Sequence, residues 1–503
     1  MKLSKLTLAV IAALGASVSS AAFAIDFYVD TKTKQIFAEP GKNRVKMGSF
    51  EQVKDANKEL ANDTKAISEI RDELELKDNA IKALEEKVVS VKEEKAKNDE
   101  KWFNKLSVRG YTQLRYNQQL SGANKDDLTG DRVLLGSPGD SANIGNNKNF
   151  SIRRMRLVFS GDINDYISVY IQPDFATGTG GALHFAQLRD AYADIHFDKA
   201  HEYRIRAGQS KIPFGWENLQ SSQNRLTLDR DDALNSAVPS ERDLGLMAYW
   251  TPADVQKLWK RLSKDGLKTS GDYGILGFGV YNGSTINTAE TNDSFHMVAH
   301  STYPFELDSL GDMFKGQVLE FGADAMTGRY TPTTGTYSLF NSTATKNTTT
   351  PMAAPNVVGN GTGVTKSISE DRVAVHAVLF PQPFGLQAEW TWGKAGALDT
   401  TNNTIRRQSL NGGYVMAMYK IDKTFSTEGT MIPYAKVQKY DGAWKAATNS
   451  PFVHVREVEA GVEYQIMKAL EVTLAYSYMD RTQTANSNRV QGDMVRMQLQ
   501  WNY

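Results

Sequence analysis

The spacing of apolar residues along the chain changes once, near residue 102. Between residues 51 and 100 apolar side chains recur with the heptad spacing of a long helix, and from residue 102 onward apolar and polar side chains alternate. Alternation with a period of two is typical of β-strands that have one face in an apolar surrounding and the other in water. The sequence therefore predicts a helical region followed by a much longer region built of strands.

The last nine residues of the chain show the strand pattern most clearly. Val495, Met497, Leu499, Trp501 and Tyr503 are apolar or aromatic, and the four residues between them are polar. Such a strand has one face in lipid and one face in water. A soluble β-sandwich would also alternate, but it seldom ends on an aromatic residue with no polar tail. The aromatic last residue instead resembles the C-terminal signal of outer-membrane barrels.

Long polar connections alternate with short ones along the strand region. The long connections are rich in Gly, Asn, Ser, Thr and Asp and span residues 121–149, 213–243, 327–369 and 480–490. Outer-membrane barrels have short turns on their periplasmic side and long loops outside. We therefore expect residues 101–503 to form an all-β transmembrane barrel of about 16 antiparallel strands, surrounded by outer-membrane lipid. With an even number of strands, the first strand begins and the last strand finishes on the same, periplasmic side of the membrane.

Residues 51–100 have the composition and spacing of an α-helical coiled coil. Ten of the twelve seam positions are apolar over six heptads. The seam consists of Val53, Ala56, Leu60, Asp63, Ile67, Ile70, Leu74, Lys77, Ile81, Leu84, Val88 and Val91. Because one chain provides one helix, this seam predicts that several copies associate in the periplasm. A single solvated helix that docks on the barrel is the alternative.

The N-terminal segment has the features of an exported protein. Lys2 and Lys5 precede an apolar stretch. Residues 22–24 (Ala-Phe-Ala) fit a signal-peptide cleavage site, so we expect residues 1–24 to be a signal peptide and the mature chain to begin at Ile25. An uncleaved membrane anchor is the less favoured alternative. Residues 25–50 alternate weakly around two turn signals and predict one small hairpin, either a periplasmic docking head or a cap on the coiled coil.

Composition and charge fit a barrel and give no sign of catalysis. The chain has no Cys, and its 58 Lys and Arg balance 58 Asp and Glu. Residues 106–503 are also close to neutral, so any preference for anions depends on where the charges lie. His296 and His300 would lie about 13 Å apart on one strand, too far to share a metal ion; His196 and His201, which flank a turn, are a weak alternative. We expect no enzyme activity, cofactor, metal site or nucleic-acid partner.

Four segments of the strand region resemble the phosphate-selective porin O/P family. They are residues 106–116 (LSVRGYTQLRY), 150–157 (FSIRRMRL), 188–194 (LRDAYAD) and 208–222 (GQSKIPFGWENLQSS). The likeness covers the barrel region and weakens after residue 250. It implies a sixteen-stranded barrel, a homotrimer, and a loop after the fifth strand that folds into the lumen and narrows the pore. In some members and relatives an N-terminal coiled coil would hold the trimer together.

Candidate selectivity residues are the basic side chains that alternation places toward the lumen, together with those of the pore loop. They are Arg109, Arg115, Arg154, Arg156, Arg204, Arg206, Lys211, Arg225, Arg230 and Arg242. The fixed fork of donors on an Arg side chain suits phosphate or carboxylate, so a series of them could pass anions stepwise.

The alternative is a general pore whose Arg side chains shape the electric field without forming a specific site. Residues 213–243 contain three basic against six acidic side chains, and some of these carboxylates could pair with wall arginines and hold the loop instead.

The expected function is passive diffusion of small hydrophilic solutes through an outer-membrane porin, with small anions such as phosphate as the expected solutes. The alternative function is structural. In that case the coiled coil would tether the outer membrane to peptidoglycan or to a periplasmic partner.

Overall fold

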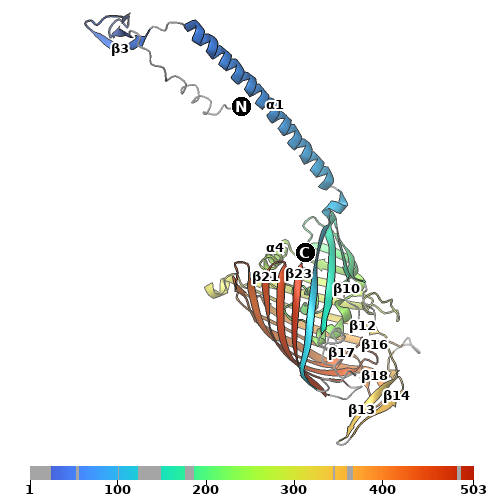
Figure 1. Cartoon of the computed structure of the whole chain (residues 1–503). Helices are drawn as coiled ribbons and strands as arrows, with labels where there is room; N and C mark the ends of the chain where they lie inside the picture. Colours follow the sequence, from blue (N-terminus) through green and yellow to red (C-terminus); the bar gives the residue numbers. More distant parts are fainter. Residues whose placement is uncertain are drawn as a thin grey trace. The chain divides into compact units, whose positions relative to one another are not determined.

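The structure, a computed structural model, describes residues 24–51, 56–99, 101–122, 149–175, 186–343, 346–359, 366–483 and 489–503 (Figure 1). It divides into two compact units, Met1–Lys97 and Asn98–Tyr503. The predicted signal peptide, apart from its last residue, lies outside the described residues.

The first unit begins with a small antiparallel sheet. Strand β1 (Ala24–Asp30) pairs with β2 (Ile36–Phe37) on one side and with β3 (Arg44–Glu51) on the other. The prediction of a single hairpin is therefore wrong, because the described part of this segment has three strands. The cause is a tight turn after β1, where the Asp30 carboxylate accepts hydrogen bonds from the Lys32 and Thr33 amides and reverses the chain early.

A single long helix follows the sheet. Helix α1 (Ala56–Asp99) covers most of the predicted coiled-coil segment. Its seam side chains are exposed in one chain, at 60% for Ile67, 58% for Leu74 and 51% for Ile81. One chain cannot bury this apolar seam, so association of helices stays a prediction. No helix in the described part of the chain is long and apolar enough to cross a membrane.

The second unit is a closed barrel. Among the described residues, sixteen strands form its antiparallel wall, as the alternation predicted. A 3-10 helix, η1 (Trp102–Lys105), precedes the first strand. The strands are β4 (Ser107–Gly122), β5 (Asn149–Asn164), β6 (Ile167–Asp174), β7 (Gln187–His196), β8 (Tyr203–Lys211), β9 (Arg242–Trp250), β10 (Leu276–Tyr281), β11 (His296–Glu306), β12 (Val318–Tyr330), β16 (Ile368–Leu379), β17 (Phe384–Asp399), β18 (Thr404–Tyr419), β20 (Thr430–Ala443), β21 (Phe452–Met467), β22 (Leu470–Gln483) and β23 (Arg489–Asn502).

The last strand closes the wall against the first. Strand β23 pairs with β4 along its length, and the Tyr503 and Gly110 backbones exchange hydrogen bonds of 2.7 and 3.0 Å. Along β23 the side chains of Met497 and Trp501 are exposed on the outer face, whereas Arg496 is buried and faces inward. The strict alternation of the C-terminal residues therefore gives one apolar and one polar face, as predicted.

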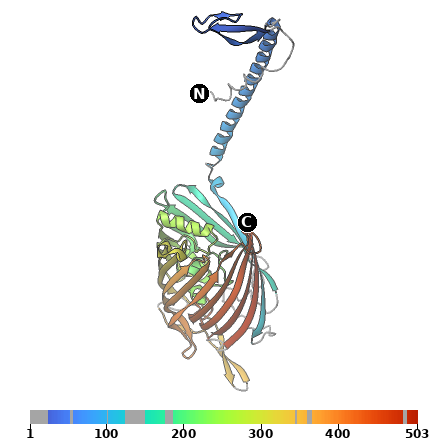
Figure 2. The same cartoon turned by 90° about the vertical axis from the view of Figure 1, so that its left-hand side faces the viewer.

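The two ends of the barrel differ. At the end where β4 begins and β23 finishes, here called the terminus end, most connections are short (Figures 1 and 2). A longer connection at this end, between β9 and β10, carries helix α4 (Ala253–Lys264). The Val255, Trp259 and Leu262 side chains of this helix are buried in a core shared with Phe380. At the opposite end, the loop end, residues 331–367 include a hairpin of β13 (Tyr337–Thr343) and β14 (Lys346–Met352). Two-residue strands, β15 (Asn356–Val357) and β19 (Ile421–Asp422), add pairings to the wall.

The connection after β8, the fifth strand of the wall, folds inward. Residues 212–241, here called the inner loop, contain the short helices α2 (Trp216–Leu219), α3 (Asp232–Ala237) and η4 (Pro239–Glu241). Apolar side chains of the loop, including Phe214 and Leu234, pack against inward-facing side chains such as Tyr414 and Ile432. The loop therefore occupies the lumen, as the family resemblance implied.

Candidate functional site

The basic side chains of the first strands face the interior of the barrel. In β5, Arg154 and Arg156 are buried while Met155 between them is exposed on the outer face. In β8, Arg204 and Arg206 are buried and alternate with Tyr203, which is also exposed outside. The alternation of these strands therefore places the Arg pairs on the lumen side, as predicted from the sequence.

An acidic residue of the inner loop lies between two wall arginines. Asp229 forms an ion pair with Arg115 of β4, with 3.3 Å between Oδ1 and Nη1, and a second, shorter one with Arg496 of β23. The Arg115 guanidinium also donates a hydrogen bond of 3.0 Å to the Leu228 carbonyl. All three charged groups are buried, so one carboxylate both neutralises two wall cations and holds the loop against the wall.

Two further carboxylates fix the loop to the later strands. Asp232 at the start of α3 accepts two hydrogen bonds from Arg481 of β22, at 3.0 and 2.8 Å. Glu217 in α2 forms an ion pair of 2.6 Å with Lys436 of β20. These acidic side chains of the inner loop are thus anchored to β20, β22, β23 and β4, which lie close to one another in the wall.

The end of the inner loop is held by a group of charges around Glu241. Arg230 contacts the Glu241 carboxylate at 2.9 Å and Lys211 contacts it at 3.5 Å, and Arg242 pairs with it as well. Burial alone would raise the pKa of Glu241, but these three cations outweigh burial and hold that pKa well below its usual range. Glu241 is therefore ionised at neutral pH and remains an anchor.

A sequence model of the phosphate-selective porin O and P family matches residues 136–503. The chain belongs to this family. Membership makes the barrel an outer-membrane channel for solute diffusion rather than an enzyme.

Several solved structures are similar to this family member. The outer membrane channel DcaP of Acinetobacter baumannii is 13% identical, with a TM-score of 0.46 over 79% of this chain and 97% of that chain. OmpT of Vibrio cholerae in its trimer form is 10% identical, with a TM-score of 0.44 over 79% and 99% of the two chains. OmpF of Salmonella typhi, in complex with daunomycin, is 12% identical, with a TM-score of 0.45 over 79% and 97%. No curated protein matches the chain significantly.

In this porin four more of the candidate arginines also have acidic partners. Arg206 donates two hydrogen bonds to Asp194 on the neighbouring strand, at 2.7 and 2.9 Å. Arg204 lies 2.9 Å from Asp272. In the remaining two pairs, Arg156 contacts Asp174 at 2.8 Å and Arg242 contacts Asp190 at 2.9 Å. The sequence predicted these cations on the lumen side but did not identify their partners.

Three candidate residues of the porin have other surroundings. Arg154 donates to the Gln113 side chain at 2.9 Å. Arg225 donates to the loop carbonyls of Thr227 and Leu228. Arg109 is exposed, and its guanidinium carbon lies 5.9 Å from the centre of the Tyr170 ring. Arg109 is therefore the most accessible of the ten candidates to a solute in water.

Sequence reasoning missed the buried cations of the later part of the barrel, in its strands and in their connections. They include Lys268, Arg372, Lys436, Lys445, Arg481 and Arg496, all buried and all ion-paired. Alternation could have found Arg496, because it occupies a polar position of the closing strand. Lys268 and Lys445 lie in connections rather than strands, where no periodic signal exists.

Proposed function

We propose that this porin passes small hydrophilic solutes by passive diffusion and prefers small anions such as phosphate. The observation that carries the proposal is the line of basic side chains on the lumen side of β4, β5 and β8. Guanidinium groups offer forked donors to phosphate or carboxylate oxygens, so a solute can exchange part of its hydration shell for these donors. The family description supports phosphate as a solute.

The ion pairs of the lumen set the strength of this preference. Most wall arginines already contact a carboxylate, so an entering anion competes with Asp174, Asp190 or Asp194 for the same donors. Such competition weakens binding and favours passage over capture, because a channel needs sites that release the solute. We therefore expect a moderate anion preference and a weak phosphate site.

Arg109 provides a direct test of the anion preference. We expect Arg109→Gln to reduce the ratio of chloride to potassium permeability by about twofold, because an exposed lumen charge attracts anions from bulk water. The matched control is Lys394→Gln, which removes an exposed cation next to the outward-facing Trp392 of β17. Both variants are compared with the wild type by reversal potential in planar bilayers. An equal change in the two variants would show that Arg109 has no specific effect.

Phosphate needs a separate measurement. Added phosphate should reduce the chloride current through single channels at millimolar concentration, since it competes for the same guanidinium donors. Sulfate at the same ionic strength is the control for a general divalent-anion effect. A chloride current that phosphate leaves unchanged would remove phosphate from the proposal and leave a general anion-preferring pore.

We further propose that the first unit lies in the periplasm and clamps a homotrimer. The exposed apolar seam of α1 supports association of helices from several chains. Deletion of residues 25–100 should then lower the temperature at which trimers dissociate in mild detergent. Trimers of unchanged stability would contradict the clamp.

The structural alternative assigns the same unit to cell-wall attachment. The small sheet β1–β3 presents exposed side chains such as Phe50 and Ile36, which a partner could cover. If the unit is a tether, the full chain but not the 25–100 deletion should sediment with purified peptidoglycan. Equal sedimentation of the two proteins would leave the trimer clamp as its role.

A further inference from the structure

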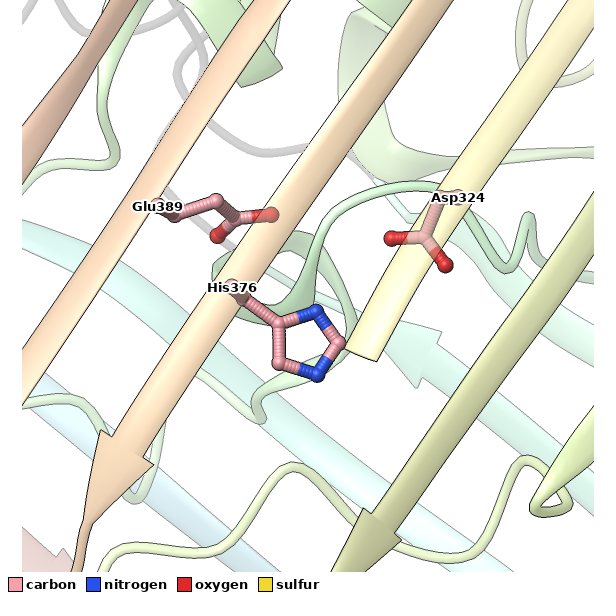
Figure 3. A group of neighbouring side chains, drawn as sticks. All are labelled: Asp324, His376 and Glu389. Atoms are coloured by element: carbon pink, nitrogen blue, oxygen red, sulfur yellow. The ribbon is translucent and has the colours of Figure 1, made fainter. Parts of the chain in front are cut away.

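Three buried side chains on adjacent strands of the barrel wall converge in the lumen. Asp324 comes from β12, His376 from β16 and Glu389 from β17, and His376 and Glu389 are direct partners in the strand register. Their potential ligand atoms all lie within 4.8 Å of one another (Figure 3). Each residue is 2% exposed, so bulk water does not screen the group.

The two carboxylates of this cluster lack the cations found beside other carboxylates of the lumen. Among the described residues, neither Asp324 nor Glu389 forms an ion pair with Lys or Arg, whereas Asp229 and Asp232 do. The ionisable partner of Asp324 is an imidazole, that of His300, at 2.5 Å. A buried carboxylate without a counter-charge is costly, and two of them close together repel one another. Positive charge bound within the cluster would therefore stabilise the two carboxylates.

The imidazole of His376 points an unused nitrogen into the cluster. Its Nε2 lies 2.9 Å from the Thr302 hydroxyl, and its Nδ1 has no hydrogen-bond partner among the described residues. Figure 3 shows Nδ1 directed between the two carboxylates. With the proton on Nε2 and donated to Thr302, the Nδ1 lone pair faces carboxylate oxygens that are also acceptors. A cation bound between them would satisfy all three groups together.

The start of the inner loop fixes the direction of both carboxylates. The Gly215 amide donates to Asp324 Oδ2 at 2.8 Å, and the Trp216 and Glu217 amides donate to the two oxygens of Glu389 at 2.7 and 3.1 Å. Gly215 has a φ of 86°, and a Cβ atom there would lie 3.2 Å from Oε1 of Glu389 in the wall. The backbone thus approaches the wall closely and holds the carboxylates in place, while each oxygen keeps a further lone pair.

We propose that Asp324, His376 and Glu389 bind one divalent transition-metal ion of the Zn²⁺ class. One imidazole nitrogen with two carboxylate oxygens suits Zn²⁺, Co²⁺ or Mn²⁺, whereas Ca²⁺ and Mg²⁺ prefer oxygen ligands alone. His300 supports the site through its hydrogen bond to Asp324, the arrangement common behind metal ligands. The bound ion links β12, β16 and β17 through ligands that already hold the start of the inner loop, and this role is independent of which solute the channel passes.

Metal titration of the full chain, without a polyhistidine tag and after treatment with EDTA, tests this site. We expect the wild type in detergent to bind about one Zn²⁺ per chain by calorimetry and elemental analysis, and to give Co²⁺ absorption bands in the visible range. His376→Gln and Glu389→Gln should each weaken Zn²⁺ binding by more than about tenfold. The matched control, His454→Gln, alters an exposed histidine that pairs with Asp441 and should bind as the wild type does.

Folding of each variant is checked by its heat-dependent migration in gels, so loss of metal can be separated from loss of the barrel. If one ligand variant does not fold, the other variant and the wild-type titration still decide. A wild type that takes up neither Zn²⁺ nor Co²⁺ at millimolar concentration overturns the proposal. Unchanged binding by a folded His376→Gln or Glu389→Gln variant also overturns it, because the ion would then lie elsewhere.

Discussion

At the residue scale, the interior of this porin is organised by ion pairs between distant parts of the sequence. Asp229 contacts Arg115 and Arg496, which are 114 and 267 residues away along the chain. Alternation along a strand predicts that an Arg side chain faces the lumen, because that information is local. It does not predict the partner, because pairing across the lumen depends on how the wall closes. For this reason the sequence could place strand residues such as Arg154 and Arg206 on the lumen side but could not show how far their charges are neutralised.

Removal of the Asp229 carboxylate should make this neutralisation measurable. Asp229→Ala leaves two buried guanidinium groups without their shared anion, so we expect a destabilisation of about 3–5 kcal/mol and a reversal potential shifted toward anions. The shift is measured in planar bilayers and the stability by thermal unfolding in detergent. Asp165→Asn, which removes an exposed carboxylate that pairs with Lys199 in a turn, is the control and should change neither quantity. A shift toward cations in Asp229→Ala would contradict the assigned role.

At the element scale, strands and helices with a strong period were predictable and irregular segments were not. The heptad pattern predicted α1, and the strict alternation predicted β23. The hairpin of β13 and β14 was missed inside a predicted long loop, because its sequence is rich in Thr, Ser and Asn and its apolar alternation is limited to Tyr337 and Leu339. In the N-terminal sheet, the strand that the sequence did not predict is β2, because it has only two residues.

The seam of α1 gives a prediction at this scale. Leu74→Asn places a polar side chain on the seam and should lower the dissociation temperature of the trimer, because it removes apolar contacts between helices. Leu76→Asn is the matched control, since Leu76 is 70% exposed and lies off the seam. Both variants are compared by gel migration after heating in mild detergent. If the two substitutions have equal effects, the heptad seam is not the contact between chains.

At the scale of the whole molecule, the barrel and its family follow from local pattern, whereas the selectivity of the pore does not. Sixteen strands with an apolar outer face require only that alternation continue along the chain. Selectivity depends on the balance of charges in the lumen. The inner loop enters this lumen and packs against its wall. The overall charge is zero, so this balance is a matter of position alone.

The zero-current potential of the wild-type channel tests the central claim most directly. The full chain is inserted into a planar bilayer that separates potassium chloride solutions differing about tenfold in concentration. The lumen arginines predict a potential whose sign shows chloride to be more permeable than potassium, with a preference of a fewfold rather than complete exclusion of cations. A potential of the opposite sign, with potassium the more permeable ion, would contradict an anion-preferring pore.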